Sequence, residues 1–296
     1  MRRLGRTAVL AILLAGLASV VATAPAGTGV AKRGASGAGL FDYDRSAPLG
    51  LVRGQTIPWQ GVLRQELAFN GAGSARFKAY FVHPTSGGPW PLVIWSPGSG
   101  GDRGQQLPDA LAAARNGLAS LLIDTPTFSN CRDAQADLDA YVGYVVSRRR
   151  AVDVAETLPN VDSTHIAAAG FSLGAEVTAS LSGVEHRIAA FTLKSGRGHL
   201  TGFARIFCRS LGTQLDAYIA ELAVVDPVHW VGSARHAAFL VQNGTQDTLT
   251  PQADVLALYT AATRPKELHW YPASHDLDSA ASAYRLRWLL RHLRPR

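Results

Sequence analysis

Residues 165–181, HIAAAGFSLGAEVTASL, decide the fold that we expect for this chain. The first part, residues 165–169, is short and mostly apolar, which is typical of a buried strand, and an apolar pattern with helical spacing begins at Leu173. The junction, residues 170–174, matches the pattern G-x-S-x-G, in which small residues on both sides of the serine permit a sharp turn. The stretch therefore predicts a strand, a tight turn that exposes the Ser172 hydroxyl, and a helix.

Strands and helices alternate on both sides of this unit. The expected strands are 61–69, 75–83, 91–95, 118–123, 166–169, 188–193, 237–242 and 266–271. The expected helices are 105–116, 137–158, one that begins at Leu173, one that begins at Pro251, and a C-terminal helix. The first two strands flank the turn 70–73 and are expected to pair antiparallel at the leading edge of the sheet. Because helices separate the later strands, the pattern predicts an α/β fold with a mostly parallel, eight-stranded sheet flanked by helices.

The N-terminus has the pattern of a secretory signal peptide. Arg2, Arg3 and Arg6 precede an apolar run over residues 8–21, and small residues follow it. This run is shorter than the roughly 20 residues that a bilayer core requires, so cleavage is expected rather than a membrane anchor. We therefore expect residues 1–26 to be removed and the mature protein to be secreted, outside the cytoplasm, with no membrane span.

The rest of the chain has the composition of one globular domain. The 296 residues are 47% hydrophobic and 17% charged, so the chain can bury a substantial core. Residues 27–40 are rich in small residues and are expected to be a disordered linker, whereas residues 41–296 are expected to form the domain. The formal net charge is +7, but the basic residues are scattered, which does not indicate nucleic-acid binding. The one basic run, residues 148–150, falls in an expected helix and is interpreted as a solvated face.

Segment 195–235 interrupts the alternation of strands and helices. It contains apolar residues at helical spacing, namely Leu215, Tyr218, Ile219 and Leu222. The segment is either a cap over the site or an ordinary connecting helix with a long lead-in, and both interpretations stay open. It also contains Cys208, which is expected to form a single disulfide with Cys131 because exported proteins reach an oxidising compartment.

The serine at the tight turn requires two partners. A serine hydroxyl is a weak nucleophile unless a histidine takes its proton and a carboxylate orients that histidine. In sites built on such a turn, the order along the chain is Ser, Asp, His. Asp247 follows the expected strand 237–242, and His275 follows the last expected strand, 266–271. Both would lie at the carboxyl edge of the sheet, so we predict a catalytic triad of Ser172, Asp247 and His275.

The two partners also have simpler interpretations. Asp247 could cap the helix that begins near Pro251, and His275 could be a surface loop histidine. The nearest rival residues are Asp226, Asp276 and His269. Asp226 precedes its expected strand and His269 lies within one, so neither has the position that the chemistry requires.

An oxyanion would need two backbone N–H donors. One is expected from Leu173, directly after the serine and at a helix N-terminus. The other is expected from the loop 96–101, SPGSGG, in which we prefer Ser99, with Gly98 as the second choice. Pro97 has no N–H group and cannot donate.

From residue 41 to the C-terminus, the sequence resembles the dienelactone hydrolase-like branch of the α/β-hydrolase superfamily. The resemblance lies in the stretches 95–101, 161–175, 241–251 and 268–275. It implies an α/β-hydrolase fold and a carboxylic ester hydrolase that uses no metal and no organic cofactor. Two positions depart from the branch, because Pro97 stands where a histidine is usual and Ser172 replaces a cysteine nucleophile. The serine favours secreted esterases or lipases over true dienelactone hydrolysis.

The expected function is hydrolysis of a small-molecule or lipid ester through an acyl-enzyme. Transfer of the acyl group to another alcohol would use the same triad and is the first alternative. A non-catalytic relative that uses the fold as a binding module is the second alternative, because a fold does not fix a function. The presence of all three triad residues in the required order argues against this second alternative.

Overall fold

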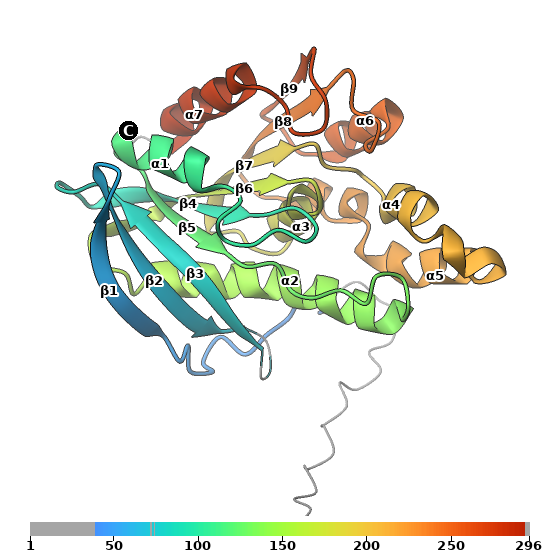
Figure 1. Cartoon of the computed structure of the whole chain (residues 1–296), viewed down its shortest axis with the longest axis horizontal. Coiled ribbons are helices and arrows are strands. Elements are labelled where there is room, and N and C mark those ends of the chain that lie inside the picture. The colour runs from blue at the N-terminus through green and yellow to red at the C-terminus, as the bar shows by residue number, and fades with distance from the viewer. Residues whose placement is uncertain (1–38, 72, 74, 294–296) are drawn as a thin grey trace, which may run out of the picture. The chain divides into compact units, whose positions relative to one another are not determined.

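One sheet of nine strands organises the residues that this computed structural model describes, which are 39–71, 73 and 75–293 (Figure 1). The strand order is β1-β2-β3-β5-β4-β6-β7-β8-β9. The strands are β1 (Val52–Trp59), β2 (Val62–Asn70), β3 (Arg76–His83), β4 (Trp90–Ser96), β5 (Ala119–Ile123), β6 (Val161–Phe171), β7 (Ile188–Lys194), β8 (Ala238–Gly244) and β9 (Lys266–Tyr271). The first three run antiparallel to their neighbours, and all later pairs are parallel. The α/β class and the mostly parallel sheet are therefore confirmed.

The described residues all belong to one unit of the chain, Ala35–Arg296. The expected signal peptide, residues 1–26, and the expected linker up to residue 38 lie outside the described residues.

The predicted number of eight strands is wrong, because the sequence pattern does not reveal β1. Every residue of this strand except Trp59 is exposed, so it has no buried face that could produce an alternating apolar pattern. It also contains Gly54 and Pro58, which weaken a strand assignment and are tolerated at a sheet edge. The expected hairpin of β2 and β3 forms as predicted, but β1 rather than this hairpin is the edge of the sheet.

Helices cover both faces of the sheet. Within the described residues they are α1 (Leu107–Arg115), α2 (Ala134–Ala155), α3 (Leu173–Ser182), α4 (Leu200–Phe207), α5 (Leu215–Leu222), α6 (Gln252–Ala261) and α7 (Ser279–Leu293). Side chains of β4 alternate between the two faces: Leu92 and Ile94 join the core with α2 and α3, whereas Val93 and Trp95 join the core with α1 and α7. Because both of their faces are buried, the inner parallel strands β4, β5, β7 and β8 are nearly continuous apolar runs, which makes them visible in the sequence.

Two of the three arginines of the basic run in α2 are buried, so its interpretation as a solvated face is wrong. Arg148 and Arg150 are 0% and 1% exposed. Arg148 donates to the carbonyl of Ile123, at the end of β5, over 3.0 Å, and to the hydroxyl of Ser96 over 3.1 Å. Arg150 donates to the carbonyl of Ala47 over 2.8 Å. These acceptors are distant in sequence, and most are backbone groups, so no local pattern could have indicated them.

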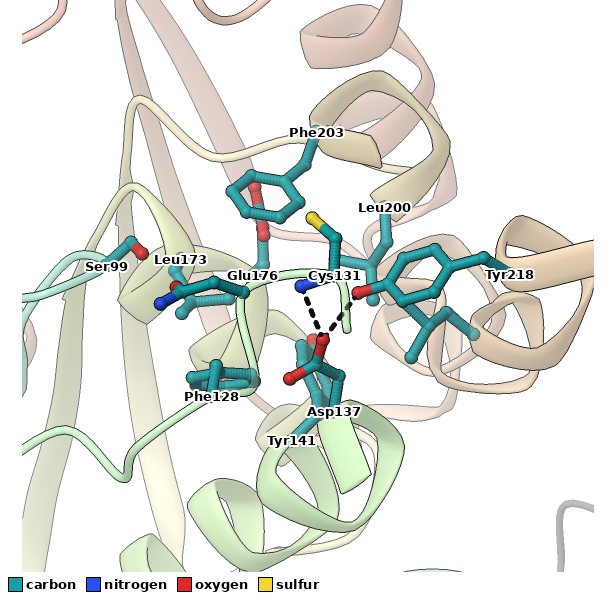
Figure 2. Close-up of a pocket in the computed structure, with 12 residues that line it drawn as sticks. Ser99, Phe128, Cys131, Asp137, Tyr141, Leu173, Glu176, Leu200, Phe203 and Tyr218 are labelled. Carbon is teal, nitrogen blue, oxygen red and sulfur yellow. Dashed lines mark hydrogen bonds between the residues drawn. The ribbon is translucent and has the colours of Figure 1, made fainter. Parts of the chain in front are cut away.

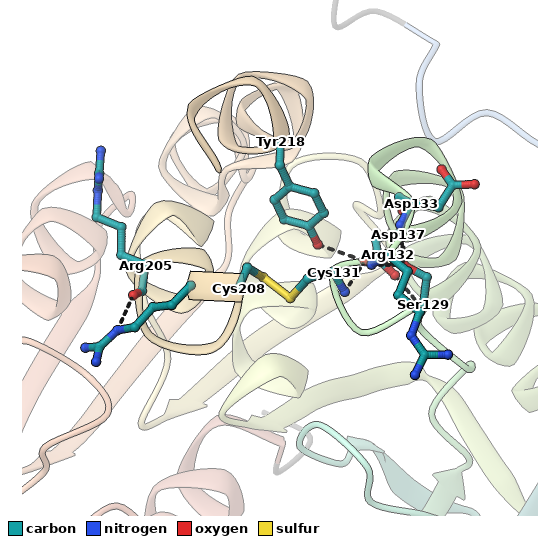
Figure 3. Close-up of a disulfide and its surroundings, with 9 residues drawn as sticks. Ser129, Cys131, Arg132, Asp133, Asp137, Arg205, Cys208 and Tyr218 are labelled. Carbon is teal, nitrogen blue, oxygen red and sulfur yellow. Dashed lines mark hydrogen bonds between the residues drawn. A yellow bond between two sulfur atoms is a disulfide. The ribbon is translucent and has the colours of Figure 1, made fainter. Parts of the chain in front are cut away.

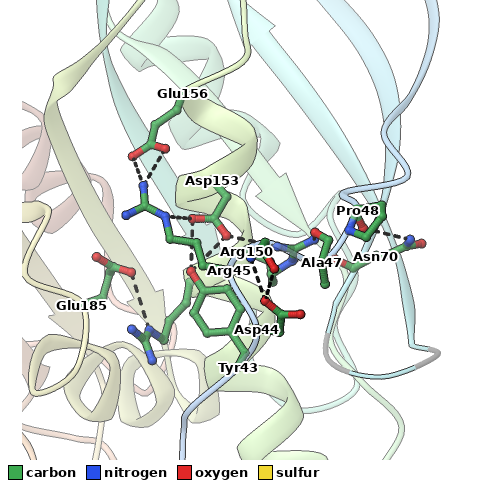
Figure 4. Close-up of polar contacts among 12 residues, drawn as sticks. Tyr43, Asp44, Arg45, Ala47, Pro48, Asn70, Arg150, Asp153, Glu156 and Glu185 are labelled. Atoms are coloured by element: carbon green, nitrogen blue, oxygen red, sulfur yellow. Dashed lines mark hydrogen bonds and ion pairs between the residues drawn. The ribbon is translucent and has the colours of Figure 1, made fainter.

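An ion-pair network holds the start of the described chain against α2 (Figure 4). The hydroxyl of Tyr43 donates to Asp153 over 2.9 Å, and the guanidinium of Arg45 lies 2.8 Å from Glu156. Arg187 approaches the Asp153 carboxylate to 2.8 Å. The Asp153 side chain is 7% exposed and that of Arg45 is 60% exposed. Because solvent screens exposed pairs, the contacts to Asp153 contribute more to fixing this segment.

Helices α4 and α5 lie side by side beyond the carboxyl ends of the parallel strands (Figure 1). The predicted amphipathic stretch forms α5, and its Tyr218 and Leu222 are buried. A disulfide joins Cys131, in the loop before α2, to Cys208, at the end of α4, across 77 positions of sequence (Figure 3). The expected disulfide is thus confirmed. Among the described helices, none combines the length and the apolar character that crossing a bilayer requires.

Candidate active site

Ser172 lies at the turn between β6 and α3, in a backbone conformation that is rare for a residue with a side chain. Its φ is 53° and its ψ is −122°. Its N–H donates to the carbonyl of Lys194 over 2.8 Å, and its carbonyl accepts the N–H of Ala175 over 2.8 Å and that of Glu176 over 3.1 Å. Non-glycine residues hold such conformations only where their surroundings fix them, and such strain is concentrated at functional sites.

The two glycines of the G-x-S-x-G pattern are required by close backbone contacts. A Cβ atom on Gly170 would clash with the backbone of Gly174, and a Cβ atom on Gly174 would clash with the carbonyl oxygen of Ser96. Neither obstacle is a flexible side chain that could move aside. The pattern is therefore explained by packing of α3 against the ends of β6 and β4, and this packing forces Ser172 into the tight turn.

Asp247 and His275 come together at the same edge of the sheet. Oδ2 of Asp247 lies 2.9 Å from Nδ1 of His275. Oδ1 of Asp247 accepts the backbone N–H groups of Leu249 over 2.8 Å and Thr250 over 3.0 Å. The Asp247 side chain is 0% exposed, and burial alone would raise its pKa. The hydrogen bonds from His275 and from the two backbone groups outweigh burial and hold the pKa of Asp247 below its usual value, so the carboxylate stays ionised.

His275 is fixed by its backbone and by an aromatic neighbour. Its carbonyl oxygen accepts the hydroxyl of Ser195 over 2.6 Å, which ties the loop to the end of β7. Its ring lies 5.2 Å from the ring of Phe171, the residue directly before Ser172. Among the hydrogen bonds of the described residues, none joins the Ser172 hydroxyl to His275. Such bonds are often long in a ligand-free site and shorten when substrate binds.

The rival residues serve other purposes in the structure. Asp226 accepts the N–H of Leu200 over 2.7 Å at the start of α4. His269 lies within β9, 3.2 Å from Glu267. Asp276 is exposed. None of these three makes a hydrogen bond to His275 or Ser172 within the described part of the chain.

The two expected oxyanion donors, Ser99 and Leu173, line the same cavity. The structure distinguishes Ser99 from the second choice, Gly98. The N–H of Gly98 donates to the side-chain oxygen of Gln105 over 2.7 Å, so it is already engaged. Sequence reasoning gave no role to Gln105, because nothing in a single sequence connects its amide to a loop seven residues earlier.

The cavity has a volume of about 40 Å³ and lies between α3, the loop before α2, and helices α4 and α5 (Figure 2). Its lining residues are mostly apolar or aromatic: Ser99, Phe128, Asn130, Cys131, Asp137, Tyr141, Leu173, Glu176, Leu200, Phe203, Tyr218 and Leu222. Asp137 has its oxygens occupied, because it accepts the Tyr218 hydroxyl over 2.8 Å, the N–H of Cys131 over 3.1 Å, and further bonds from Ser129. Segment 195–235 therefore supplies one wall of this cavity through α4 and α5.

A buried ion pair in the cavity wall was missed by sequence reasoning. Oε1 of Glu176 accepts Nε of Arg197 over 2.5 Å, and the two side chains are 0% and 3% exposed. Oε2 of Glu176 is buried without a hydrogen-bond partner. Burial raises the pKa of Glu176, and the charge of Arg197 only partly opposes this effect. In the sequence, this ion pair could have been suspected from Glu176 itself, an acidic residue four positions after Ser172 in a helix otherwise made of small and apolar residues.

The described residues contain no group of three or more His, Cys, Asp or Glu side chains that could hold a metal ion.

Comparisons with known proteins give a likeness of structure and no close relative in sequence. No protein-family model matches the chain, and no curated protein matches it. The acetyl xylan esterase from Paenibacillus sp. R4 is similar with a TM-score of 0.74 and 18% identity, over 87% of this chain and 92% of that one. Acetyl xylan esterase 1 from Thermoanaerobacterium sp. JW/SL YS485 gives a TM-score of 0.73 and 16% identity, over 86% and 92%.

A third solved structure, 2,6-dihydroxy-pseudo-oxynicotine hydrolase, has a TM-score of 0.64 and 17% identity, over 78% of this chain and 67% of that one. At these identities the likeness concerns architecture. Together with the strand order and the strand-turn-helix unit at Ser172, it shows that this chain has the α/β-hydrolase fold.

Proposed function

We propose that this protein is a serine hydrolase that cleaves carboxylic esters through an acyl-enzyme intermediate. The observation that carries the proposal is the hydrogen bond between the buried Asp247 and Nδ1 of His275, 2.9 Å long, at the sheet edge where Ser172 is held in a strained turn. An ionised carboxylate on Nδ1 keeps the other ring nitrogen free to accept a proton.

Ester cleavage then proceeds in two halves. In the first half, Oγ of Ser172 attacks the carbonyl carbon while Nε2 of His275 takes the hydroxyl proton. The N–H groups of Leu173 and Ser99 hold the oxyanion of the tetrahedral intermediate. When the intermediate collapses, the bond to the leaving alcohol breaks and His275 returns the proton to that alcohol. In the second half, water attacks the acyl-enzyme by the same route and releases the acid and free Ser172.

The names of the similar structures bear on the nature of the substrate. Two of the similar structures are named acetyl xylan esterases, which supports an ester rather than an amide and a short acyl group.

We also propose that the protein is secreted. Secretion is supported by the signal-peptide pattern of residues 1–26 and by the Cys131–Cys208 disulfide, because disulfides persist in oxidising compartments.

The test is hydrolysis of p-nitrophenyl esters from acetate to palmitate by the wild-type protein, the Ser172→Ala variant and the Ser182→Ala variant. Ser182 is a matched control, because it is a buried serine on the same helix whose hydroxyl donates to the carbonyl of Ala179. We expect turnover by wild type and Ser182→Ala and none by Ser172→Ala, with a fluorophosphonate probe labelling only the first two. Equal turnover by Ser172→Ala, or no turnover of any ester by wild type, would refute the proposal.

A further inference from the structure

The loop that follows β4 lies directly against the proposed nucleophile. Gly98 is buried, and a Cβ atom on it would be 3.3 Å from the Cβ atom of Ser172. Ser99, the next residue, lines the cavity together with Leu173. In the part of the chain that the structure describes, no hydrogen bond engages the N–H of Ser99. This N–H is therefore available to an oxyanion, provided that the loop holds it in place.

The peptide group between Pro97 and Gly98 is held at both of its ends. Its carbonyl oxygen accepts the hydroxyl of Tyr144 over 2.6 Å. Its N–H donates to Oε1 of Gln105 over 2.7 Å. The ring of Pro97 also fixes φ of that residue. The plane of this peptide group cannot rotate without breaking at least one of the two hydrogen bonds, so the backbone that leads to Ser99 has a defined direction.

The bond from Tyr144 is buried. Tyr144 lies on α2 and is 0% exposed, and the guanidinium of Arg148 lies 4.1 Å from the centre of its ring. Burial raises the pKa of Tyr144, although the charge of Arg148 opposes this effect, so the hydroxyl keeps its proton and can donate it to the carbonyl of Pro97. A buried carbonyl that lost its donor would stay unpaired, which costs more than the loss of a hydrogen bond in water.

The next peptide group, between Gly98 and Ser99, is bound through its carbonyl oxygen. This oxygen accepts the N–H of Gly101 over 3.0 Å and the hydroxyl of Thr125 over 3.4 Å. Hydrogen bonds to a carbonyl polarise the peptide group and strengthen its N–H as a donor. The N–H of Gly98 is thus used within the protein, whereas that of Ser99 is polarised and has no partner among the described residues.

We propose that Tyr144 and Gln105 are positioning residues for the oxyanion hole: by holding the peptide group between them, they aim the N–H of Ser99 at the oxyanion. This inference rests on the proposed function. Both residues act through the backbone and not through contact with the substrate. Donors that are aimed in advance at the developing charge stabilise the transition state more than the bound ester, so this arrangement affects kcat rather than KM.

The first test removes the bond on the carbonyl side. Tyr144→Phe deletes the hydroxyl and keeps the ring beside Arg148. In hydrolysis of p-nitrophenyl acetate, we expect kcat to fall by about 10- to 100-fold and KM to stay within about twofold, because both halves of the reaction pass through an oxyanion. The matched control is Tyr43→Phe. It deletes a hydroxyl that is bonded to Asp153, on the helix that carries Tyr144, from a ring that lies 4.7 Å from the guanidinium of Arg149. We expect this control to keep the kcat of wild type.

The second test removes the bond on the N–H side. Gln105 is exposed, so Gln105→Met is expected to fold even if Tyr144→Phe does not. It should lower kcat by about 10- to 100-fold with little change in KM. The matched control is Gln65→Met, which removes an amide that donates to the carbonyl of Gly54 over 2.8 Å. Gln65 lies on β2, which three strands separate from β6, so we expect this control to keep the kcat of wild type.

Inhibition by butylboronic acid distinguishes positioning from a general loss of structure. Boronic acids add to a nucleophilic serine and form a tetrahedral adduct with an oxygen in the position of the oxyanion. Its Ki should therefore rise in both variants by about the factor by which kcat falls, 10- to 100-fold. A merely structural role would lower the amount of folded enzyme and leave Ki unchanged.

The outcomes separate this inference from the proposed function. A folded Tyr144→Phe or Gln105→Met variant that keeps the kcat and Ki of wild type overturns the inference, and so does an equal loss in a variant and its control. If only one of the two variants folds, that variant decides. Ser172-dependent turnover with unaffected variants refutes the inference alone. Absence of both turnover and fluorophosphonate labelling in wild type would refute the proposed function, and the inference with it.

Discussion

Nδ1 of His275 lies 2.9 Å from Oδ2 of Asp247, and each residue stands on a loop that follows its own parallel strand. Asp247 and His275 are 28 positions apart in the chain, and they meet because the sheet order places β8 beside β9. The loop after β8 packs so closely on the loop after β9 that a Cβ atom on Gly244 would clash with the backbone of Ala273. The pair is therefore positioned by the backbone as well as by its own hydrogen bond.

Replacing Asp247 by Asn should reduce kcat by about 10³- to 10⁴-fold, because the amide does not stabilise the imidazolium and favours the wrong tautomer of His275. The exposed neighbour Asp276 supplies the control, since Asp276→Asn also removes one negative charge near His275. We expect this control to stay within about threefold of wild type, as surface charges in water interact weakly. Steady-state hydrolysis of p-nitrophenyl butyrate measures both variants, and a similar loss in the two would show that general charge rather than orientation matters.

The tight turn gives a second prediction, on stability. Gly174→Ala should lower the free energy of unfolding by at least about 3 kcal/mol, because the new methyl group meets the backbone of Ser96 and cannot be relieved by a side-chain movement. Gly143→Ala is the control, because this helix position in α2 has open space around it and alanine is the better helix former by about 1 kcal/mol. Urea unfolding followed by circular dichroism should give a lower free energy of unfolding than wild type for Gly174→Ala and a higher one for Gly143→Ala.

Much of the fold is visible in the sequence, because parallel strands that are buried on both faces leave continuous apolar runs. The runs at β4, β5, β7 and β8 were located to within a few residues for this reason. The exposed edge strand β1 leaves no such trace. The predicted helix begins at residue 137, whereas α2 begins at Ala134. Asp133 accepts the N–H of Ala136 as a helix cap, but an aspartate in a polar loop is not a specific signal.

For the candidate site too, the sequence predicts residues whose pattern is local and misses those whose contacts are distant in the chain. Ser172 could be recognised because Gly170 and Gly174 flank it within five residues of sequence, although the group that a Cβ atom on Gly174 would meet is the distant backbone of Ser96. Asp247 and His275 could be inferred only because the fold brings strand ends to one edge. The Gln105 amide accepts a backbone N–H of the preceding loop, and Arg197 pairs with a carboxylate on another element; no periodicity or spacing in one sequence records such contacts.

The disulfide between Cys131 and Cys208 gives a third prediction. It closes a loop of 77 positions, and on the chain-entropy model it stabilises the fold by roughly 4 kcal/mol. The Cys131→Ala, Cys208→Ala double variant should lose about this much free energy of unfolding. A reducing agent should lower the unfolding midpoint of wild type to that of the variant and leave the variant unchanged. If the variant and reduced wild type both unfold at the midpoint of untreated wild type, the prediction is contradicted.

The ammonium group of Lys194 is largely buried, which disfavours its charged form. It is the last residue of β7, and its Nζ lies 4.4 Å from the ring centroid of Phe171. Burial lowers the pKa of Lys194 to about 8, and the nearby charge of Arg285 acts in the same direction, against Asp109 and Asp276. In the unfolded chain a lysine titrates near 10.4.

This difference in pKa makes the contribution of Lys194 to stability depend on pH. Between about pH 8 and pH 10.4 the unfolded chain holds the Lys194 proton and the folded protein has released it, so the free energy of unfolding rises with pH in this window. Lys194→Met has nearly the same shape and no proton to lose. Relative to this variant, wild type should gain about 2 kcal/mol of stability between pH 7 and pH 10, because the other ionisable groups titrate alike in both proteins. Urea unfolding of both proteins at the two pH values measures the gain. If the free energies of unfolding of the two proteins differ by the same amount at both pH values, Lys194 is charged in the folded protein throughout.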